Sequence, residues 1–180
     1  MDYSQFLAMK QEISLLVLFL LIFLYDTFAC KKAQGYIGYI TCVLFAVFTA
    51  LGFCPCCTGS CSAQDAFAGM YETSGAINAI KNILNVGVLI VMIQSLRWTA
   101  NEYQTIRRGE FYELILLTLF GMFLMISGRH FLVFFIGLEC ASLPLAALVA
   151  FNKHRYESQE AAAKYILTAV FSSAVLLMGL

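Results

Sequence analysis

The sequence predicts an all-α membrane protein of about six transmembrane helices. Of its 180 residues, 61% are hydrophobic and only 12% are charged, whereas soluble domains carry about 25% charged residues. The apolar residues gather into six runs, and each run has or approaches the roughly 20 residues that a helix needs to cross about 30 Å of hydrocarbon. We therefore expect helices over residues 6–25, 36–53, 77–96, 111–127, 131–151 and 161–180.

The first run could also be the core of a signal peptide, because residues 13–25 have that length and Cys30 follows as a lipoprotein cleavage cysteine would. However, its basic flank is a single Lys10 beside Glu12, and Asp26 stands where a small neutral residue belongs. Five more apolar runs follow. We therefore predict that this run stays in the protein as a spanning helix.

Basic residues predict the orientation, because short loops rich in Lys and Arg stay inside. With the N-terminus outside, seven bases fall on inner segments: Lys31, Lys32, Arg97, Arg107, Arg108, Lys153 and Arg155. Outer segments then hold only Lys10 and Arg129. The sequence therefore favours an outside N-terminus, while Lys81 and Lys164 lie within or at the mouths of spans and need another explanation. The net charge of zero indicates no nucleic-acid partner.

Two charges in the last runs are the main candidates for function. Glu139 lies in the middle of 131–151, where a dozen Leu, Ile, Val and Phe residues allow the helix to insert into the membrane despite the acid. Lys164 lies in 161–180, which has only eight such residues, so this helix should need a neighbouring helix to stay in the membrane. Ionisable residues at this depth usually serve protons or ions. Alternatively, Lys164 could extend toward the inner surface and Glu139 could be a hydrogen-bonded neutral acid.

The remaining polar side chains give weaker signals. Cys54, Cys56, Cys57 and Cys61 crowd one loop, but no matching ligand cluster follows, so loop thiols or a disulfide are favoured over a metal. The other three cysteines, Cys30, Cys42 and Cys140, are interpreted as small apolar residues. Both histidines, His130 and His154, are expected at helix ends. Phosphate-loop, dinucleotide, haem and nucleophile motifs are absent from the sequence. We therefore expect no cofactor and no redox chemistry in this chain.

Several linked motifs in the second half carry a family resemblance. In order, they are Gly109-Glu110-Phe111-Tyr112, Gly121-Met122 to Ser127, Gly137-Leu138-Glu139, Ser142-Leu143-Pro144-Leu145, Ser158-Gln159-Glu160-Ala161, Lys164-Tyr165 and Ser172-Ser173. Their order and spacing closely resemble subunit N of the proton-pumping NADH:quinone oxidoreductase, respiratory complex I. The match is strong over residues 110–179. Asn78, Lys81 and Asn85-Val86-Gly87 look like the lead into that family's third helix, and residues 1–60 match only as two apolar spans.

The resemblance implies an antiporter-like subunit of about fourteen helices with inverted repeats. Residues 1–100 would form its first three helices, and residues 101–180 would begin the antiporter-like repeat with helices four to six. Glu139 matches the family's fifth-helix glutamate, and Lys164 matches its sixth-helix lysine, which together form a proton path. Glu110 matches an acid at the inner mouth of the fourth helix, although an interfacial charge is an equal alternative. Glu113 has no role that the resemblance supplies.

The resemblance also implies partners and a location. NADH, flavin, iron–sulfur clusters and quinone would sit in partner subunits of the enzyme, and this chain would contact other membrane subunits and lipid, in a bacterial inner membrane. A subunit of a multi-subunit cation/proton antiporter would use the same Glu139 and Lys164. A structural or assembly protein is a third alternative.

The chain departs from the family pattern at three places. Ala146 and Met178 replace tyrosines that the family usually has, so a polar neighbour of Glu139 is expected to be missing. The sequence ends at Leu180, before the family's seventh and eighth helices, and we expect it to be a fragment or a truncated product.

The sequence also predicts how Glu139 and Lys164 are placed. Counting from a turn at 153–158 separates their depths by roughly 12 Å. A direct ion pair is therefore not expected. Water or a polar side chain such as Thr168 should join the two residues.

Overall fold

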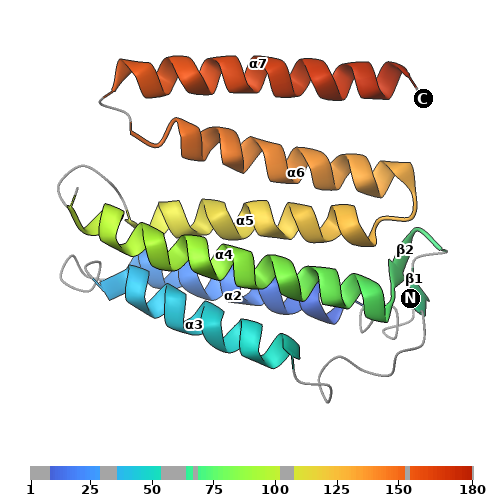
Figure 1. The fold of residues 1–180 in the computed structure, drawn as a ribbon, viewed down its shortest axis with the longest axis horizontal. Helices are drawn as coiled ribbons and strands as arrows, with labels where there is room; N and C mark the ends of the chain where they lie inside the picture. The colour runs from blue at the N-terminus through green and yellow to red at the C-terminus, as the bar shows by residue number, and fades with distance from the viewer. Residues whose placement is uncertain are drawn as a thin grey trace.

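The computed structural model describes residues 9–28, 36–53, 64–66, 69–101, 108–152 and 155–179. These residues form six helices and one small hairpin (Figure 1). The elements are α2 (Lys10–Phe28), α3 (Ile37–Phe53), β1 (Gln64–Ala66), β2 (Tyr71–Thr73), α4 (Gly75–Asn101), α5 (Arg108–Ser127), α6 (Phe131–Val149) and α7 (Tyr156–Met178). Each helix overlaps one predicted run, so the all-α prediction is confirmed.

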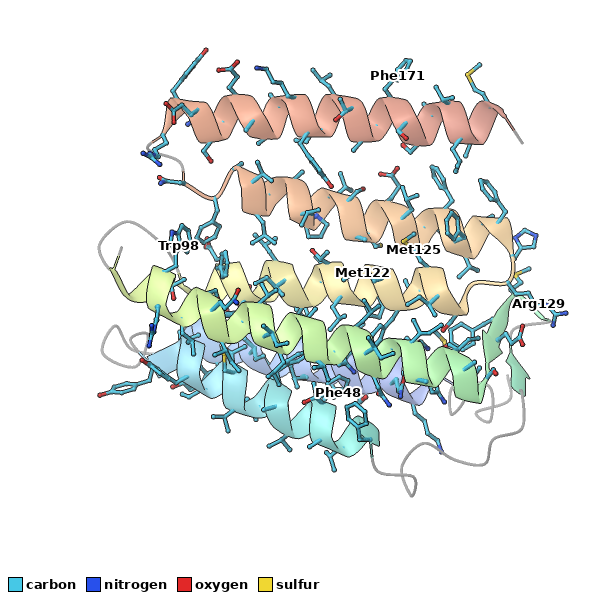
Figure 2. All side chains as sticks on the ribbon, in the orientation of Figure 1. Phe48, Trp98, Met122, Met125, Arg129 and Phe171 are labelled. Carbon is cyan, nitrogen blue, oxygen red and sulfur yellow. The ribbon has the colours of Figure 1, made fainter. Side chains whose placement is uncertain are left out.

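Among the described residues, five helices are long and apolar enough to cross a membrane, and α3 is a shorter apolar helix. Large hydrophobic side chains cover the outside of the bundle: Leu21, Ile83 and Phe171 are 57%, 69% and 72% exposed. Figure 2 shows Phe171 pointing away from the rest of the bundle. Such a surface would promote aggregation in water but suits hydrocarbon. The chain is therefore an integral membrane protein.

Several helix ends differ from the predicted ones by up to five residues, and those at the turn between α6 and α7 bear most on the site. α6 ends at Val149 rather than at residue 151, and α7 begins at Tyr156 rather than at residue 161. Polar residues in the first turn of α7 hid its start from a search for apolar runs. They nevertheless favour a helix start, because Glu157 complements the helix dipole and Ser158 Oγ donates to the Val149 carbonyl at 2.6 Å.

The core forms around α5, which contacts α2, α3, α4 and α6. On α5 the fully buried side chains recur at helical spacing: Tyr112, Leu116, Leu119 and Phe123. They pack with Leu15, Leu18 and Ile22 of α2, Phe45 of α3 and Met92 of α4. α5 is thus the central helix, on which α2, α3, α4 and α6 pack.

Glycines allow α5 and α6 to approach closely. A Cβ atom on Gly121 would lie 2.4 Å from the Ala141 backbone nitrogen, and one on Gly137 would lie 2.7 Å from the Met125 backbone nitrogen. Small residues of this kind let membrane helices pack backbone to backbone. This seam fixes the position of α6, which carries Glu139.

The β1–β2 hairpin lies across the end of the bundle where α5 ends (Figure 1). Tyr71 pairs with Gly128 in a β-bridge, and the Met70 carbonyl accepts hydrogen bonds from the backbone N–H groups of Arg129 and His130 at 3.0 and 3.3 Å. Gly69, in the turn before β2, has a φ of 82°, which favours glycine. The hairpin thereby holds the Tyr71 side chain against the bundle.

Candidate functional site

Glu139 lies on the side of α6 that faces away from α5. It follows Gly137 by two residues, or about 200° around a helix, and Gly137 packs against α5. Since α6 lies between α5 and α7 (Figure 1), this side looks toward α7. Ala146 shares the face and is 3% exposed, and Ser142 donates to the Glu139 backbone carbonyl at 3.3 Å rather than to the carboxylate. Among the described residues, the Glu139 carboxylate makes no ion pair.

Lys164 faces away from α6. The most buried residues of α7, Ala162 and Ser173, share one face with Tyr165, and that face packs on α6. Lys164 follows Ala162 by about 200° and is 74% exposed. Its ammonium donates to Glu160 Oε1 at 2.6 Å, one turn earlier on the same helix. The lysine is therefore presented on the open side of α7.

The predicted depth difference between the two residues is wrong, because it used the wrong helix ends. Glu139 lies ten residues before the end of α6, and Lys164 lies eight residues after the start of α7. At 1.5 Å per residue their depths differ by about 3 Å. As expected, no direct ion pair joins them in the described part of the chain. The reason is that the side chains face different directions.

Thr168 does not bridge the pair. Its hydroxyl donates to the backbone carbonyls of Lys164 and Tyr165, both at 2.9 Å, within its own helix. A hydrated connection between Glu139 and Lys164 stays a prediction.

Glu110 lies in an acidic group where α5 begins. Gly109 is packed against the Asp26 carboxylate, which would be 2.2 Å from a Cβ atom at that position. Asp26 and Glu110 both act electrostatically on Glu113, whose buried Oε1 has no hydrogen-bond partner within the described residues. A helix N-terminus favours negative charge, which explains how α5 holds carboxylates at this end.

A buried ion pair that the sequence analysis did not identify lies at the other end of the bundle. Glu12 of α2 and Lys81 of α4 are 2% and 1% exposed, and the Lys81 ammonium donates to Glu12 Oε1. Ser127 Oγ, at the end of α5, donates to the same oxygen at 3.4 Å. Lys81 Nζ also lies 3.3 Å from the Tyr71 hydroxyl, and 5.6 Å from the ring centroids of both Tyr71 and Phe123.

The signal for this pair was present in the sequence. Glu12 and Lys81 both fall within predicted apolar runs, as Glu139 and Lys164 do. Beside Lys10, however, Glu12 resembles a flanking charge, and Lys81 lies near the start of its run. The rule that intramembrane charges deserve a functional explanation would have selected both.

Tyr71 closes the ion-pair site from the side of the hairpin. Burial raises the pKa of Tyr71 well above its usual 10.0, and the nearby Glu12 carboxylate raises it further. The phenol therefore stays protonated and can donate a hydrogen bond. Outside the site, Arg129 and Glu72 form an exposed ion pair at 3.9 Å.

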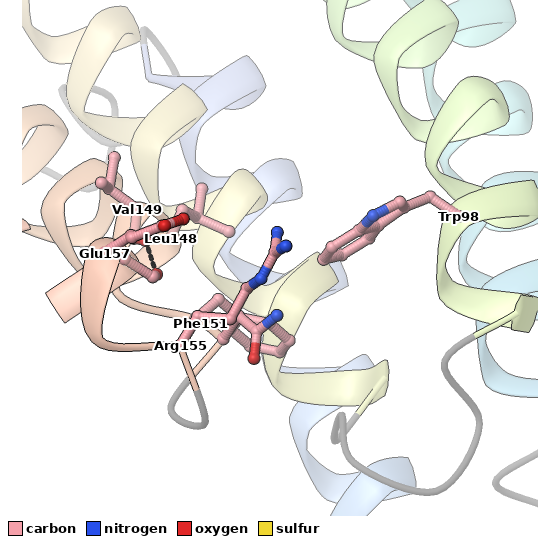
Figure 3. A pocket seen from close by; sticks show the side chains of 8 residues that line it. Trp98, Leu148, Val149, Phe151, Arg155 and Glu157 are labelled. Atoms are coloured by element: carbon pink, nitrogen blue, oxygen red, sulfur yellow. Dashed lines mark hydrogen bonds between the residues drawn. The ribbon is translucent and has the colours of Figure 1, made fainter. Parts of the chain in front are cut away.

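An open pocket lies at the opposite end, between α4 and the turn that joins α6 to α7 (Figure 3). Its volume is about 330 Å³, and its lining residues are Trp98, Leu148, Val149, Phe151, Asn152, Arg155, Glu157 and Ser158. Ring contacts from Trp98 to Phe111 and from Phe111 to Phe151 connect its walls at 5.7 and 5.3 Å. None of the predicted site residues lines this pocket.

The described residues contain no group of three or more His, Cys, Asp and Glu side chains that could hold a metal ion. Cys42 and Cys140 are free and partly buried. His130 is exposed at the start of α6, where its Nδ1 accepts a hydrogen bond from Leu132 N–H at 3.2 Å. The remaining predictions lie outside the described residues, namely those on Cys30, Cys54, Cys56, Cys57, Cys61 and His154.

Comparison with known proteins supports the resemblance found in the motifs. A family model described as NADH:quinone oxidoreductase/Mrp antiporter, transmembrane, matches residues 128–180. NADH-quinone oxidoreductase subunit N from Azobacteroides pseudotrichonymphae is 44% identical over all 180 residues, and subunit N from Phocaeicola vulgatus is 38% identical over the same length. The chain covers 37% of each of these two relatives.

A solved structure agrees. A chain of respiratory complex I from Thermus thermophilus with bound aureothin superposes with a TM-score of 0.65 and 27% identity, over 94% of this chain and 35% of that one. The match includes the first three helices, where the sequence motifs were weak. The chain is thus similar along its whole length to subunit N of NADH-quinone oxidoreductase, and the resemblance seen in its motifs is confirmed.

Proposed function

We propose that this chain is part of a proton-translocating membrane subunit of NADH:quinone oxidoreductase. The observation that carries the proposal is a carboxylate and an ammonium, Glu139 and Lys164, at nearly equal depth on adjacent spanning helices of a chain that aligns throughout with subunit N. Other subunits would bind NADH, flavin, iron–sulfur clusters and quinone, and would carry out the redox chemistry. This chain would supply part of the proton path.

In this proposal, Glu110 and its acidic neighbours receive protons at the inner mouth, Glu139 holds a proton within the membrane, and Lys164 passes it on. Because Glu139 looks toward α7 and Lys164 looks away from α6, the transfer between them needs water or a movement of α7. The open side of α7 leaves Lys164 accessible to a helix outside these 180 residues. Contacts with that helix would replace the exposed ion pair between Lys164 and Glu160, which contributes little to stability.

The proposed orientation places the N-terminus outside, in a bacterial inner membrane. The seven-to-two distribution of basic residues supports it. The acidic group at the start of α5 would then lie at the inner surface, and the Glu12–Lys81 pair would lie near the outer surface.

The test is Glu139→Gln in the complete native assembly, since this change keeps the volume and removes the charge. Proton pumping should fall more than NADH oxidation measured with an artificial electron acceptor. The matched control is Glu157→Gln, an exposed acid in the first turn of α7, which should leave both activities unchanged. Normal pumping in Glu139→Gln would refute the proton-path role.

A cation/proton antiporter subunit is a second candidate, because the matching family model covers both kinds of protein. Purification of the native assembly distinguishes the two. Subunits that react with NADH and quinone should accompany the chain if the first proposal is correct, whereas an antiporter assembly would lack them.

A further inference from the structure

We infer that Glu12 and Lys81 form a second proton-holding site, separate from Glu139 and Lys164, at the end of the bundle where α2 begins and α5 ends. This inference rests on the proposed function for the direction in which protons move. It adds a functional site to the first three helices, to which the family resemblance assigned no role.

The location of the pair argues against a purely structural role. Both side chains are almost fully buried, in helices whose outer sides expose large hydrophobic residues such as Leu21 and Ile83. Taking two charges out of water costs several kcal/mol per ion, and well-packed hydrophobic residues of similar volume often serve stability as well or better. An ion pair kept in such a place is better explained by function.

The surroundings offset part of the cost of a charged Lys81 beside a neutral Glu12. The Lys81 ammonium lies over the faces of two rings, Tyr71 and Phe123, each 5.6 Å away at the centroid. Aromatic faces attract a cation, more strongly where water is excluded. The ammonium therefore retains favourable contacts when the carboxylate beside it is neutral.

One oxygen of Glu12 is available for a proton. Oε1 accepts from Lys81 and Ser127, whereas Oε2 is buried without a hydrogen-bond partner among the described residues. Asn85, one turn after Lys81 on α4, is 2% exposed, and its buried acceptor, Oδ1, likewise has no partner in the described part of the chain. Buried acceptors are normally satisfied, and where no protein donor exists the donor is water. Two such acceptors, on Glu12 and one helical turn from Lys81, indicate a hydrated site.

The proton step is uptake at Oε2. A hydronium ion delivers its proton to the Glu12 carboxylate and leaves water, so that the ion pair, of net charge zero, becomes a neutral acid beside an ammonium, of net charge plus one. Release of the same proton to water restores the ion pair. Within the described part of the chain, the other titratable group that contacts the pair is Tyr71 of β2, and α5 contributes the Ser127 hydroxyl.

The site exchanges protons with the nearer surface. Further along the bundle the interior becomes apolar, with Leu15, Phe45 and Met92 all fully buried. This largely apolar layer separates Asn85 from the polar side chains of Ser95 and Thr99 near the other end of α4. The pair is therefore a terminal proton holder at one surface, which would be the outer one in the proposed orientation.

The experiment uses the complete native assembly with the double change Glu12→Gln and Lys81→Met, which removes both charges together. If the site holds a proton, the double variant should assemble and oxidise NADH with an artificial acceptor, but move fewer protons per NADH oxidised. Infrared difference spectra between alkaline and acidic pH should lose a deuterium-sensitive carboxyl band that Glu157→Gln retains. The infrared readout does not depend on pumping.

Normal pumping together with an unchanged carboxyl band in the double variant would overturn the inference, because the pair would then be structural. Failure of the double variant to assemble would also overturn it, since the pair would be needed for folding. The Glu139→Gln variant separates this inference from the proposed function. If that variant pumps normally while the double variant pumps less, the Glu139–Lys164 path fails and the Glu12–Lys81 site stands.

Discussion

Two lysines in this chain illustrate how strongly position determines the meaning of a charge. Lys164 is 74% exposed and pairs with Glu160 one turn away, whereas Lys81 is 1% exposed and pairs with Glu12 from another helix. Exposed ion pairs one helical turn apart, like Lys164–Glu160, contribute about 0.3–0.5 kcal/mol to the free energy of unfolding. Breaking a buried pair of the second kind costs about 3–5 kcal/mol, because the remaining charge has no partner.

The stability of the Glu12–Lys81 pair can be tested directly. We predict that Lys81→Met lowers the free energy of unfolding by about 3–5 kcal/mol, because it leaves the Glu12 carboxylate buried and unpaired. Adding Glu12→Gln should recover most of this loss. Unfolding of the purified protein in detergent measures both changes, with Lys164→Met as the control, for which we expect less than about 1 kcal/mol. A double variant no more stable than Lys81→Met would contradict the assignment.

Tyr71 offers a test by pH. Burial and then Glu12 raise its pKa above 10.0, so its phenol should ionise only after the exposed tyrosines have ionised. Because the unfolded chain ionises this phenol first, its contribution to stability is complete below pH 10.0 and is lost as the pH rises through the folded-state pKa. Phenolate absorbance of the unaltered protein and of Tyr71→Phe should coincide near pH 10 and differ only at higher pH. A difference already at pH 10 would show that Tyr71 ionises normally.

At the scale of the helices, the contact between α5 and α6 depends on glycine. We predict that Gly121→Ala destabilises the protein by about 1–3 kcal/mol, because overpacking forces the two backbones apart. A Cβ atom there would meet the Ala141 and Cys140 backbones at 2.4 and 2.7 Å.

Gly87 of α4 is the matched control, since nothing lies within 4 Å of its added Cβ. Gly87→Ala should stabilise the helix by up to about 1 kcal/mol through helix propensity alone. Thermal unfolding of the two variants in detergent compares them. Equal effects of the two substitutions would show that α5 and α6 are not in close contact.

The helices could be predicted from the sequence because hydropathy reports the membrane directly. The ends of the helices could not be predicted in this way. The first turn of α7, for example, is helical but polar, so hydropathy does not detect it. The side of α7 that packs on α6 was partly predictable from the sequence. Helical spacing puts Ala162, Tyr165 and Ser173 on that side and Lys164 on the opposite one. The Glu12–Lys81 pair required knowing that α2 and α4 both pack on α5, and the order of helices along the chain does not give that.

For the whole molecule, the described core combines helices from both halves of the chain. Leu15 of α2 and Met92 of α4 share one cluster with Tyr112 and Phe123 of α5. The division into residues 1–100 and 101–180 stays a prediction, as it concerns the repeat of a longer protein. Packing on α5 joins the two parts. Hydrogen bonds between them add to it, such as those from Arg129 and His130 N–H to the Met70 carbonyl.

The last prediction concerns orientation. The six described helices alternate in direction, so α2, α4 and α6 begin at one end of the bundle and α3, α5 and α7 begin at the other (Figure 1). Lys32, Arg107 and Lys153 belong to the connections α2–α3, α4–α5 and α6–α7, whereas Gly59 belongs to the connection α3–α4. Single cysteines introduced at the first three positions, in a background without the native cysteines, should therefore share one side of the membrane. The excess of basic residues predicts that this side is inside. An impermeant thiol reagent should label those three in inverted vesicles and a cysteine at Gly59 in right-side-out vesicles, whereas labelling of the three from different sides would overturn this topology.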